Sequence, residues 1–355
     1  MTLRVGFVGA GWWAVSNHMP LFAADSRVTL AGVCRKGAAE LKTVRDRFGF
    51  SYATEDFDDL LGNCPMDALV IATPHALHAA QAEAAARRGL HVLIEKPAAL
   101  SLADVRRTVA ACDEARVHAL VPYGWNFKPF MATARAWIAE GAIGSIQHVA
   151  ARMASPIGAL MSGQDLPGTE NETFRPDPAM WADPKTGGYG WGQLVHLLGA
   201  LFWLAPDLVP QMVRGMTQRP GGSADLYNVA AVSCLDGATL AISGAATLPE
   251  GSAFDLALDF YGTEGVLSIQ VAPTSVTLRR HDGAHRALDL APDAGLYECT
   301  EPVRRFIDLC CGEAVQNAGP LSCAVPGVAV IEAMHASSAA GMDITIEPKK
   351  ERTNP

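Results

Sequence analysis

The first 123 residues alternate between short apolar runs and longer amphipathic segments. The apolar runs at residues 3–8, 28–33, 68–72, 91–94 and 118–121 predict strands that are buried on both faces of a parallel sheet. Between them, helical spacing predicts helices that end near residue 24 and that cover residues 38–48, 78–88 and 102–115. Strands separated by helices of this length form βαβ units, so we predict a doubly wound α/β domain.

The pattern changes after about Tyr123. A helix at 130–140, a strand at 146–152, a Gly/Pro-rich loop at 155–190 and an apolar helix at 193–204 come first. Strand-like runs follow at 211–217, 228–234, 238–245, 254–261, 265–270 and 275–279, and helices at 301–311 and 328–340 finish the chain. Short connections such as Asp236-Gly237 predict hairpins, so this second sheet should be open and mainly antiparallel. We expect two domains, residues 1–123 and 124–355.

A glycine turn follows the first strand directly and opens the first helix. In Gly9-Ala10-Gly11-Trp12-Trp13-Ala14, Gly9 permits the tight turn and Gly11 lets a pyrophosphate approach the backbone. Ala14 replaces the third glycine, which only has to allow close packing of helix and strand. The position predicts a dinucleotide site at Gly9, Gly11, Trp12 and Trp13, and the alternative is a glycine-rich turn without a ligand.

The end of the second strand indicates which dinucleotide is bound. An acidic residue at this position reads the ribose of NAD, whereas a cation accommodates the 2′-phosphate of NADP. This chain has Arg35 and Lys36 there. Because Arg pairs with phosphate through two parallel hydrogen bonds, NADP is favoured over NAD. The alternative is a solvated pair, with NAD held by other contacts.

Two further motifs lie at the carboxyl ends of later strands. Thr73-Pro74-His75 closes the third predicted strand and His78 opens the next helix, while Glu95-Lys96-Pro97 closes the fourth. Together with the glycine turn, these motifs make the chain resemble the Gfo/Idh/MocA family of nicotinamide-dependent sugar and cyclitol oxidoreductases. Looser matches continue to the end of the chain, at Trp181, Gly187-Gly188, His196, residues 261–265 and residues 332–341.

The resemblance implies a Rossmann domain, then an α/β domain whose open sheet uses one face as an oligomer interface. It further implies that Lys96 contacts the substrate hydroxyl and the nicotinamide ribose, and that His196 is the acid/base. The other side chains expected at the cofactor are Thr73, Pro74, His75, His78, Glu95 and Asn126. A neutral imidazole suits proton transfer near pH 7, and a lysine stabilises a developing alkoxide. Without a ligand, His196 would be a core histidine on an apolar helix.

The chain departs from the family pattern at two positions. An Asp is common four residues before the histidine, and here that position is Gly192, followed by Gln193. Glycine neither orients an imidazole nor accepts a proton, so the usual trio is incomplete. An Arg is common after the fifth strand, and here Asn126 takes its place, with Lys128 as a displaced cation. The alternative for this segment is a structural turn.

The expected substrate is a sugar, sugar derivative or cyclitol. Trp181, Tyr189 and Trp191 cluster in the sequence, and sugar rings pack their C–H faces against aromatic rings. The same side chains would otherwise cover the second sheet. The substrate contacts we expect are Lys96, Trp125, Lys128, Arg152, Trp181, Tyr189, Gln193 and His196.

Three functions are compatible with these motifs. The first is an NAD(P)-dependent oxidoreductase that transfers a hydride between a secondary hydroxyl or keto group and the nicotinamide. The second is a glycosidase that oxidises its substrate transiently and recycles a bound NAD cofactor. The third is a nucleotide-binding sensor without catalysis, against which Lys96 and His196 together argue.

Composition narrows the remaining classes. The chain has 355 residues and a net charge of −9, which argues against a sequence-independent nucleic-acid binder. The first apolar run is too short for a secretory signal, and no uncharged apolar stretch approaches the roughly 20 residues of a membrane helix. Eight scattered cysteines without a CxxC pair suggest reduced thiols and no metal site. We expect a cytoplasmic homo-oligomer, a dimer or tetramer, without membrane or nucleic-acid partners.

Overall fold

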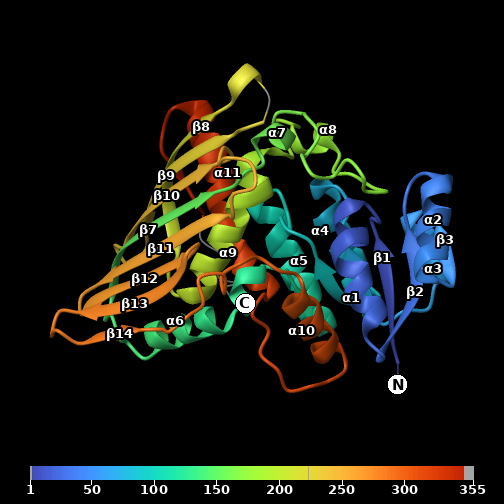
Figure 1. Ribbon diagram of the computed structural model, residues 1–355, viewed down its shortest axis with the longest axis horizontal. Coiled ribbons are helices and arrows are strands. Elements are labelled where there is room, and N and C mark those ends of the chain that lie inside the picture. The colour runs from blue at the N-terminus through green and yellow to red at the C-terminus, as the bar shows by residue number, and fades with distance from the viewer. Residues whose placement is uncertain (1, 223, 348–355) are drawn as a thin grey trace, which may run out of the picture.

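The N-terminal strands form a six-stranded parallel sheet in the order β3-β2-β1-β4-β5-β6. The computed structural model describes residues 2–222 and 224–347 (Figure 1). The strands of this sheet are β1 (Leu3–Val8), β2 (Val28–Cys34), β3 (Tyr52–Thr54), β4 (Ala68–Ile71), β5 (His91–Ile94) and β6 (Ala119–Leu120). Its helices are α1 (Met19–Ala24), α2 (Ala38–Phe48), α3 (Phe57–Asn63), α4 (His78–Arg87) and α5 (Leu102–Ala115). This strand order places a ligand crevice at the carboxyl ends of β1 and β4, where the chain reverses direction across the sheet.

Both faces of this sheet are buried. On one face Phe7 packs with Phe22 of α1, and on the other Ile71 and Ile94 pack among the alanines of α4. Helix α10 (Thr300–Cys310) returns from the far end of the chain and sets Phe306 against Phe22, with 6.2 Å between ring centroids. The apolar core of the N-terminal sheet is therefore completed by a helix nearly 200 positions later in the sequence, which is a contact that local pattern does not reveal.

The second sheet has nine strands in the order β14-β13-β12-β11-β7-β10-β9-β8-β15. Its strands are β7 (Ile146–Ala154), β8 (Pro210–Gln218), β9 (Tyr227–Cys234), β10 (Thr239–Ala245), β11 (Asp255–Gly262), β12 (Gly265–Val271), β13 (Thr274–Arg280), β14 (His285–Ala287) and β15 (Ile344–Thr345). All neighbouring pairs are antiparallel except β7 with β10. The expected α/β fold with an open, mainly antiparallel second sheet is confirmed.

Helices cover one face of the second sheet, between it and the N-terminal sheet (Figure 1). They are α9 (Val195–Leu204) and α11 (Ala324–Ala340), with α6 (Pro129–Ala139) at one end and the short helices α7 (Gly158–Met161) and α8 (Pro178–Trp181) beside them. The stretch Leu321–Ala340 is long and apolar enough to cross a membrane by length and composition alone, and half of it is buried in the protein. Glu332 interrupts this stretch and accepts a hydrogen bond from the Leu102 amide, at 2.8 Å. Its contacts are those of a core helix.

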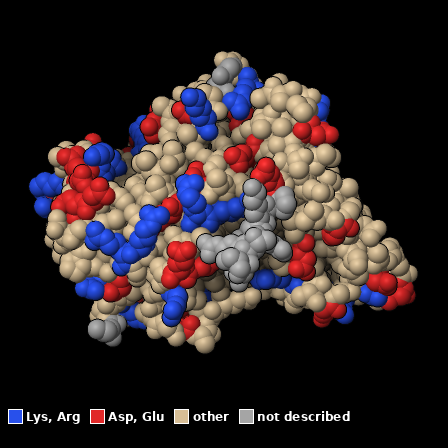
Figure 2. Space-filling view, turned by 180° about the vertical axis from the view of Figure 1, so that it is seen from behind, with Lys and Arg blue, Asp and Glu red and all other residues tan. Residues whose placement is uncertain are grey.

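The opposite face of the second sheet is open to solvent and carries apolar side chains. Met216 is 66% exposed, Val229 49% and Tyr261 41%. Elsewhere, side chains of both signs are interspersed over the face of the molecule seen from behind (Figure 2).

The structure departs from the sequence prediction in several elements. The strands β3, β14 and β15 and the helix α3 were not predicted, because each is short and β3 has only half-buried residues. The segment predicted as a loop at 155–190 contains α7 and α8. Helix α11 begins at Ala324 and not at 328, since Pro326 lies in its first turn, where proline costs no hydrogen bond. The division at residue 123 stays a prediction.

Candidate functional site

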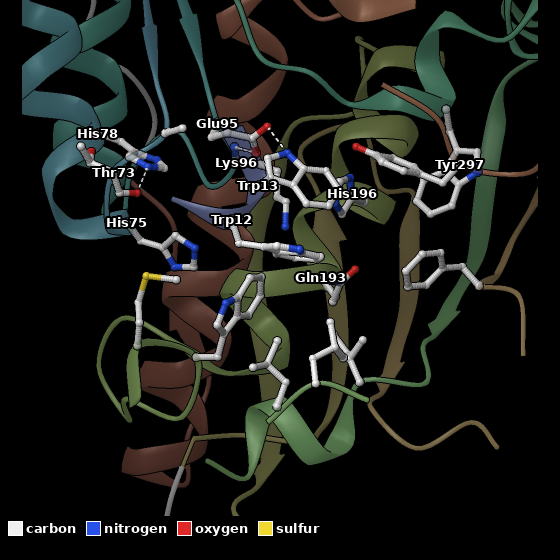
Figure 3. A pocket seen from close by; sticks show the side chains of 18 residues that line it. Trp12, Trp13, Thr73, His75, His78, Glu95, Lys96, Gln193, His196 and Tyr297 are labelled. Atoms are coloured by element: carbon white, nitrogen blue, oxygen red, sulfur yellow. Dashed lines mark hydrogen bonds between the residues drawn. The ribbon is translucent and has the colours of Figure 1, made fainter. Parts of the chain in front are cut away.

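A cavity of about 340 Å³ lies between the N-terminal sheet and the second sheet (Figure 3). Its walls come from the carboxyl ends of β1, β4 and β5, from the start of α9, and from loops of the C-terminal half. The lining side chains that the sequence predicted are Trp12, Trp13, Thr73, His75, His78, Glu95, Lys96, Trp125, Trp181, Gln193 and His196. Folding therefore brings most of the expected cofactor and substrate residues into one place.

The glycine turn has the shape that a dinucleotide requires. Gly9 has φ +85°, and a Cβ there would lie 2.4 Å from the backbone of Ala72, so only glycine fits beside β4. A Cβ on Gly11 would meet nothing within 4 Å, so the backbone is open where a phosphate would approach. Ala14 is buried, as close packing of helix and strand demands. The amides of this first helical turn have no partners within the helix, and these groups fit the pyrophosphate of NAD(P).

Arg35 lies at the end of β2 beside the glycine turn. Its guanidinium donates to the carbonyl of Ala10 and lies over the ring of Phe174, 4.5 Å from its centroid. Burial lowers the pKa of Arg35. Its Nε is buried without a hydrogen-bond partner among the described residues, so the group retains a donor for a ligand. The neighbouring Lys36 is exposed.

Glu95 is held as a buried carboxylate. Its Oε1 accepts from Trp13 Nε1 at 2.8 Å and lies 2.6 Å from His18 Nε2, and Figure 3 shows the indole pointing at it. Burial opposes ionisation, but the hydrogen bond from His18 and the charge of Lys96 outweigh it and lower the pKa to about 2. The carboxylate therefore ties the glycine turn to the end of β5 and balances the charge of Lys96.

Lys96 spans from β5 to the start of α9. Its Nζ donates to the backbone carbonyl of Gly192 at 2.7 Å and lies 5.2 Å from the ring centroid of Trp181. Burial lowers the pKa of Lys96, while the carboxylate of Glu95 opposes that shift. One ammonium donor is thus used to fix the side chain, and two remain for an oxygen in the cavity.

His196 is 4% exposed and surrounded by aromatic rings. Its ring centroid lies 5.2 Å from that of Tyr297, 5.6 Å from Trp125 and 6.3 Å from Tyr123. Burial, and then the charge of Lys96, lower the pKa of His196 well below its usual value. The imidazole is therefore neutral at pH 7. Its Nδ1 has no hydrogen-bond partner among the described residues, so packing alone orients the ring.

A π-helical turn at Gly190–Leu194 leads into α9 and presents Gln193 to the cavity. Asp225 holds the start of this turn, because its Oδ2 accepts from the Gly190 amide at 2.8 Å and from Asn228 Nδ2 at 2.6 Å. A Cβ on Gly192 would lie 2.7 Å from both the Trp181 ring and Met161. The indole of Trp181 therefore fills the space that a side chain at residue 192 would need.

The two histidines after β4 are fixed by backbone carbonyls. His75 Nδ1 lies 2.6 Å from the Thr186 oxygen, and burial lowers the pKa of His75 to about 3. His78 lies between the oxygens of Thr73 and Pro97, at 2.6 and 2.8 Å, and burial lowers its pKa as well. Both side chains reach the cavity edge, and their contacts position the backbone around Thr73.

Several predicted ligand residues lie outside the cavity. Asn126 is buried, and its Nδ2 donates to the carbonyls of Gly199 and Ala318, which is the structural-turn alternative. Lys128 forms an ion pair with Glu298 at 3.8 Å. The polar groups of Asn126 and Lys128 are therefore occupied by contacts within the protein. The roles at cofactor or substrate that we expected for these two residues do not fit their positions.

Arg152 and Tyr189 are likewise placed elsewhere. Arg152 faces the open side of the second sheet, where it pairs with Asp255 at 3.3 Å, because its neighbours Ala151 and Met153 face the core. Tyr189 is fully buried against β10, and its hydroxyl lies 3.0 Å from Ser155 Oγ. Lys36 and Pro74 do not line the cavity. The expected substrate contacts of Arg152 and Tyr189 therefore do not fit the structure.

The sequence analysis missed a group of apolar residues that complete the cavity. Tyr297 comes from the long segment before α10 and Phe254 from the residue just before β11, both distant in sequence from the motifs of the N-terminal half. The others are Ala72, Ile157, Leu160, Leu166 and Met180. These side chains have no local pattern that separates them from ordinary core residues, because long-range folding alone brings them to the site.

Family models of known proteins match most of the chain. Residues 3–123 match the family model "Oxidoreductase family, NAD-binding Rossmann fold", and residues 131–268 match the model "GFO/IDH/MocA C-terminal domain". Among solved structures, the WlbA dehydrogenase from Bordetella pertussis in complex with NADH and UDP-GlcNAcA superposes with a TM-score of 0.75 at 22% identity. The superposition covers 98% of this chain and 100% of that one. At this identity the likeness establishes the fold.

Two curated relatives match over less than half of this chain. D-xylose 1-dehydrogenase [NADP(+)] of Haloarcula marismortui is 30% identical over 46% of this chain and 46% of its own. The 1-carboxy-3-chloro-3,4-dihydroxycyclohexa-1,5-diene dehydrogenase of Comamonas testosteroni is 31% identical over 41% of this chain and 37% of its own. The chain thus spans less than half the length of each of these relatives.

Proposed function

Because this chain belongs to the Gfo/Idh/MocA family of Rossmann-fold oxidoreductases, we propose that it is an NAD(P)-dependent dehydrogenase of small cyclic alcohols. It would act on a secondary hydroxyl or keto group of a sugar, sugar derivative or cyclitol. The observation that carries this proposal is the meeting of Lys96 and His196 in one cavity with the residues that close β1 and β4. The two curated relatives, one named for a pentose and one for a cyclohexadiene diol, both act on ring or sugar hydroxyls by their names.

The chemistry assigns a separate task to each side chain. The nicotinamide, when bound, accepts or supplies the hydride. His196 is neutral and takes the hydroxyl proton as the alcohol is oxidised. The ammonium of Lys96, which Gly192 and Trp181 hold in place, donates to the same oxygen and stabilises its developing negative charge. In the reverse direction His196 would return the proton.

The preferred coenzyme in this proposal is NADP. Arg35 and Lys36 both lie at the end of β2, and Arg35 has an unpartnered buried Nε. A cation at this place accommodates the 2′-phosphate. The name of the Haloarcula relative, which includes NADP(+), is in keeping with this choice, while the WlbA structure holds NADH.

The test is the amount of reduced nicotinamide formed per molecule of product, over sugars and cyclitols with each coenzyme. A dehydrogenase gives one-to-one stoichiometry. Lys96→Met and His196→Asn should each lower kcat by about 10²- to 10⁴-fold, while circular dichroism stays unchanged and the His196→Asn protein still binds the dinucleotide. His148→Asn, on the open face of the second sheet, is the matched control. Unchanged turnover in both cavity variants would refute the proposed roles, and dinucleotide binding without any turnover would favour a sensor.

A glycosidase with a recycled cofactor is the second candidate, and one contact favours it. Part of the long loop at 155–190 lies against the glycine turn, where Glu172 accepts from Ser16 at 2.9 Å and Phe174 packs on Arg35. Such a cover would slow exchange of a bound dinucleotide. Glycoside cleavage without net reduction of added coenzyme would support this function and exclude the dehydrogenase.

We also propose that the open face of the second sheet joins copies of this chain in a dimer or tetramer. Its exposed apolar side chains, such as Met216 and Val229, lie on neighbouring strands. Met216→Lys with Val229→Lys should convert the oligomer to a smaller species in light scattering. Ala39→Lys on the exposed side of α2 is the control, and a wild-type monomer would refute the interface.

A further inference from the structure

The connection between α7 and α8 reaches from the C-terminal half over to the N-terminal half (Figure 1). We call residues 162–177 of this connection the strap. Glu172 of the strap accepts a hydrogen bond from Ser16 in the turn of helix after the glycine motif, at 2.9 Å. Phe174 lies on the guanidinium of Arg35, with 4.5 Å between the guanidinium carbon and the ring centroid. The strap therefore touches the dinucleotide site, although it is distant in sequence from the Rossmann motifs.

The position of Phe174 is fixed by the strap's own structure and by packing. The Glu172 amide donates to the Thr169 carbonyl at 3.1 Å. The guanidinium of Arg175, the next residue along the chain, donates to the Glu170 carbonyl. Phe174 is 9% exposed and belongs to the same buried apolar cluster as the strands of the N-terminal sheet. The ring is therefore part of the N-terminal core, although its residue belongs to the C-terminal half.

Arg35 is a half-buried cation without a counter-ion. Its guanidinium donates to the carbonyl of Ala10 in the glycine turn, and its Nε is buried without a hydrogen-bond partner. Among the residues that the structure describes, no carboxylate forms an ion pair with it. Burial lowers the pKa of Arg35, and the charge of Glu40 opposes that shift. An unpaired, partly desolvated cation is unfavourable, so this site fits an anionic group of a ligand.

The ring of Phe174 has two physical effects on this guanidinium. It removes water from one face of the group, and a hydrogen bond from a cation to an anion is stronger where water is excluded. Together with the Ala10 carbonyl, it also restricts a side chain that otherwise has many rotamers, so less conformational entropy is lost when an anion binds. Both effects strengthen binding of a phosphate at Arg35.

These effects concern the one group by which the two coenzymes differ. NADP carries a 2′-phosphate on its adenosine ribose, whereas NAD has a hydroxyl there and gains little from a cation. A side chain that orients Arg35 should therefore change the affinity for NADP and leave the affinity for NAD nearly unchanged.

We propose that Phe174 of the strap determines the coenzyme preference of this protein. It is a positioning residue, which holds Arg35 in the orientation that binds the 2′-phosphate of NADP. Discrimination between the coenzymes thus depends on the C-terminal half as well as on the end of β2. This inference rests on the proposed preference for NADP and adds the residue that makes Arg35 selective.

The first experiment measures binding, without turnover, by isothermal titration calorimetry. The ligands are NADP and NAD, and the fragments 2′,5′-ADP and 5′-AMP, which differ from each other only in the 2′-phosphate. Phe174→Ala should lower the ratio of the NAD Kd to the NADP Kd by about 10-fold, the size of one weakened charge-assisted hydrogen bond. The ratio for the two fragments should fall by the same factor, while NAD and 5′-AMP bind nearly as before.

Three further variants separate positioning from packing. Phe174→Tyr keeps the ring and should keep the wild-type ratio. Phe174→Leu keeps apolar packing where the alanine variant does not fold, and the loss of the aromatic face should still lower the ratio by about 2- to 5-fold. Phe48→Ala removes a similar ring from Arg47 on α2, where the guanidinium carbon lies 5.0 Å from the ring centroid. As the matched control, it should leave the ratio unchanged.

A double-mutant cycle links Phe174 to Arg35. In an Arg35→Ala background, Phe174→Ala should no longer change the ratio, because no guanidinium remains to be oriented. Equal losses for both coenzymes in Phe174→Ala would show that the ring only packs the strap, and would overturn this inference alone. A wild type that binds NAD as tightly as NADP, and 5′-AMP as tightly as 2′,5′-ADP, would overturn the proposed coenzyme preference together with this inference.

Discussion

At the scale of single residues, Arg35 decides the coenzyme in our proposal. Arg35→Asp places a negative charge where the 2′-phosphate would lie, so we expect kcat/KM with NADP to fall by about 10- to 100-fold. This magnitude is that of one charge-assisted hydrogen bond. Initial rates with both coenzymes measure the effect, and Lys42→Asp on the exposed side of α2 is the control. Equal losses with NAD and NADP would show that Arg35 does not distinguish them.

Gly192 and Trp181 form a coupled pair. Gly192→Asp, which introduces the acid common in the family, forces a Cβ to within 2.7 Å of the indole. We expect it to lower the free energy of unfolding by about 1 to 3 kcal/mol through overpacking. Urea unfolding should show that Gly192→Asp costs less in a Trp181→Ala background than in the wild type. Strict additivity of the two changes would contradict this coupling.

The sequence motifs predicted the site residues whose chemistry can be recognised from their neighbours in the sequence. Gly9, Lys96 and His196 occupy the ends of predicted elements, and the structure brings them together. Asn126 was assigned from the family pattern after the fifth predicted strand and Arg152 from its place at the end of a strand, but a buried turn and the alternation along β7 direct them elsewhere. Successive side chains of a strand point to opposite faces of the sheet, so the direction of one side chain depends on which of its neighbours face the core. A single polar residue in the sequence does not determine that direction.

At the scale of elements, the π-helical turn at Gly190–Leu194 positions Gln193 and leads into the helix that carries His196, and Asp225 fixes the start of this turn. Asp225→Ala would leave the Gly190 amide and the Asn228 side chain without their buried acceptor. We expect a loss of about 2 to 4 kcal/mol in unfolding free energy, because each unsatisfied buried group costs about 1 to 3 kcal/mol. Chemical denaturation measures it, with the exposed Asp236→Ala as control. A change below about 0.5 kcal/mol would contradict this role.

Strong periodicity explains which elements the sequence predicted. The buried strands β1, β2, β4 and β5 are continuous apolar runs, and the longer strands of the second sheet alternate, so both kinds were located. The short edge strand β3 has three half-buried residues and no such pattern. Helix α10 was predicted as an element, but its packing on the N-terminal sheet depends on contacts across the whole chain.

At the scale of the whole molecule, the cavity lies where two separately patterned halves meet. The N-terminal half provides the turn, Glu95 and Lys96, and the C-terminal half provides His196 and the hydrocarbon wall. Neither half contains the complete arrangement. Closing the site therefore buries titratable groups, and this burial makes the fold sensitive to acid.

The expected dependence of stability on pH follows from the direction in which burial shifts the pKa values of the cavity histidines. Burial lowers the pKa of His75 from 6.5 to about 3 and lowers that of His196 in the same direction. Below pH 6.5 the unfolded chain binds protons that the folded chain refuses, so the stability present above pH 6.5 is lost as the pH falls toward 3. Each such histidine contributes a slope of up to about 1.4 kcal/mol per pH unit. Glu95, with its pKa lowered from 4.5 to about 2, adds a further loss below pH 4.5.

Urea unfolding at pH 7.5, 6.5, 5.5 and 5.0 measures this slope directly. The wild type should lose stability progressively below pH 6.5. His75→Asn should lose stability less steeply, because the variant lacks one side chain that binds a proton in the unfolded chain but not in the folded chain. The slope is informative even where the variant is less stable at every pH. His281→Asn, at an exposed position, should leave the slope unchanged. A wild-type stability that is flat between pH 7.5 and 5.0 would mean that the unfolded and folded chains bind equal numbers of protons, and that the cavity histidines are hydrated.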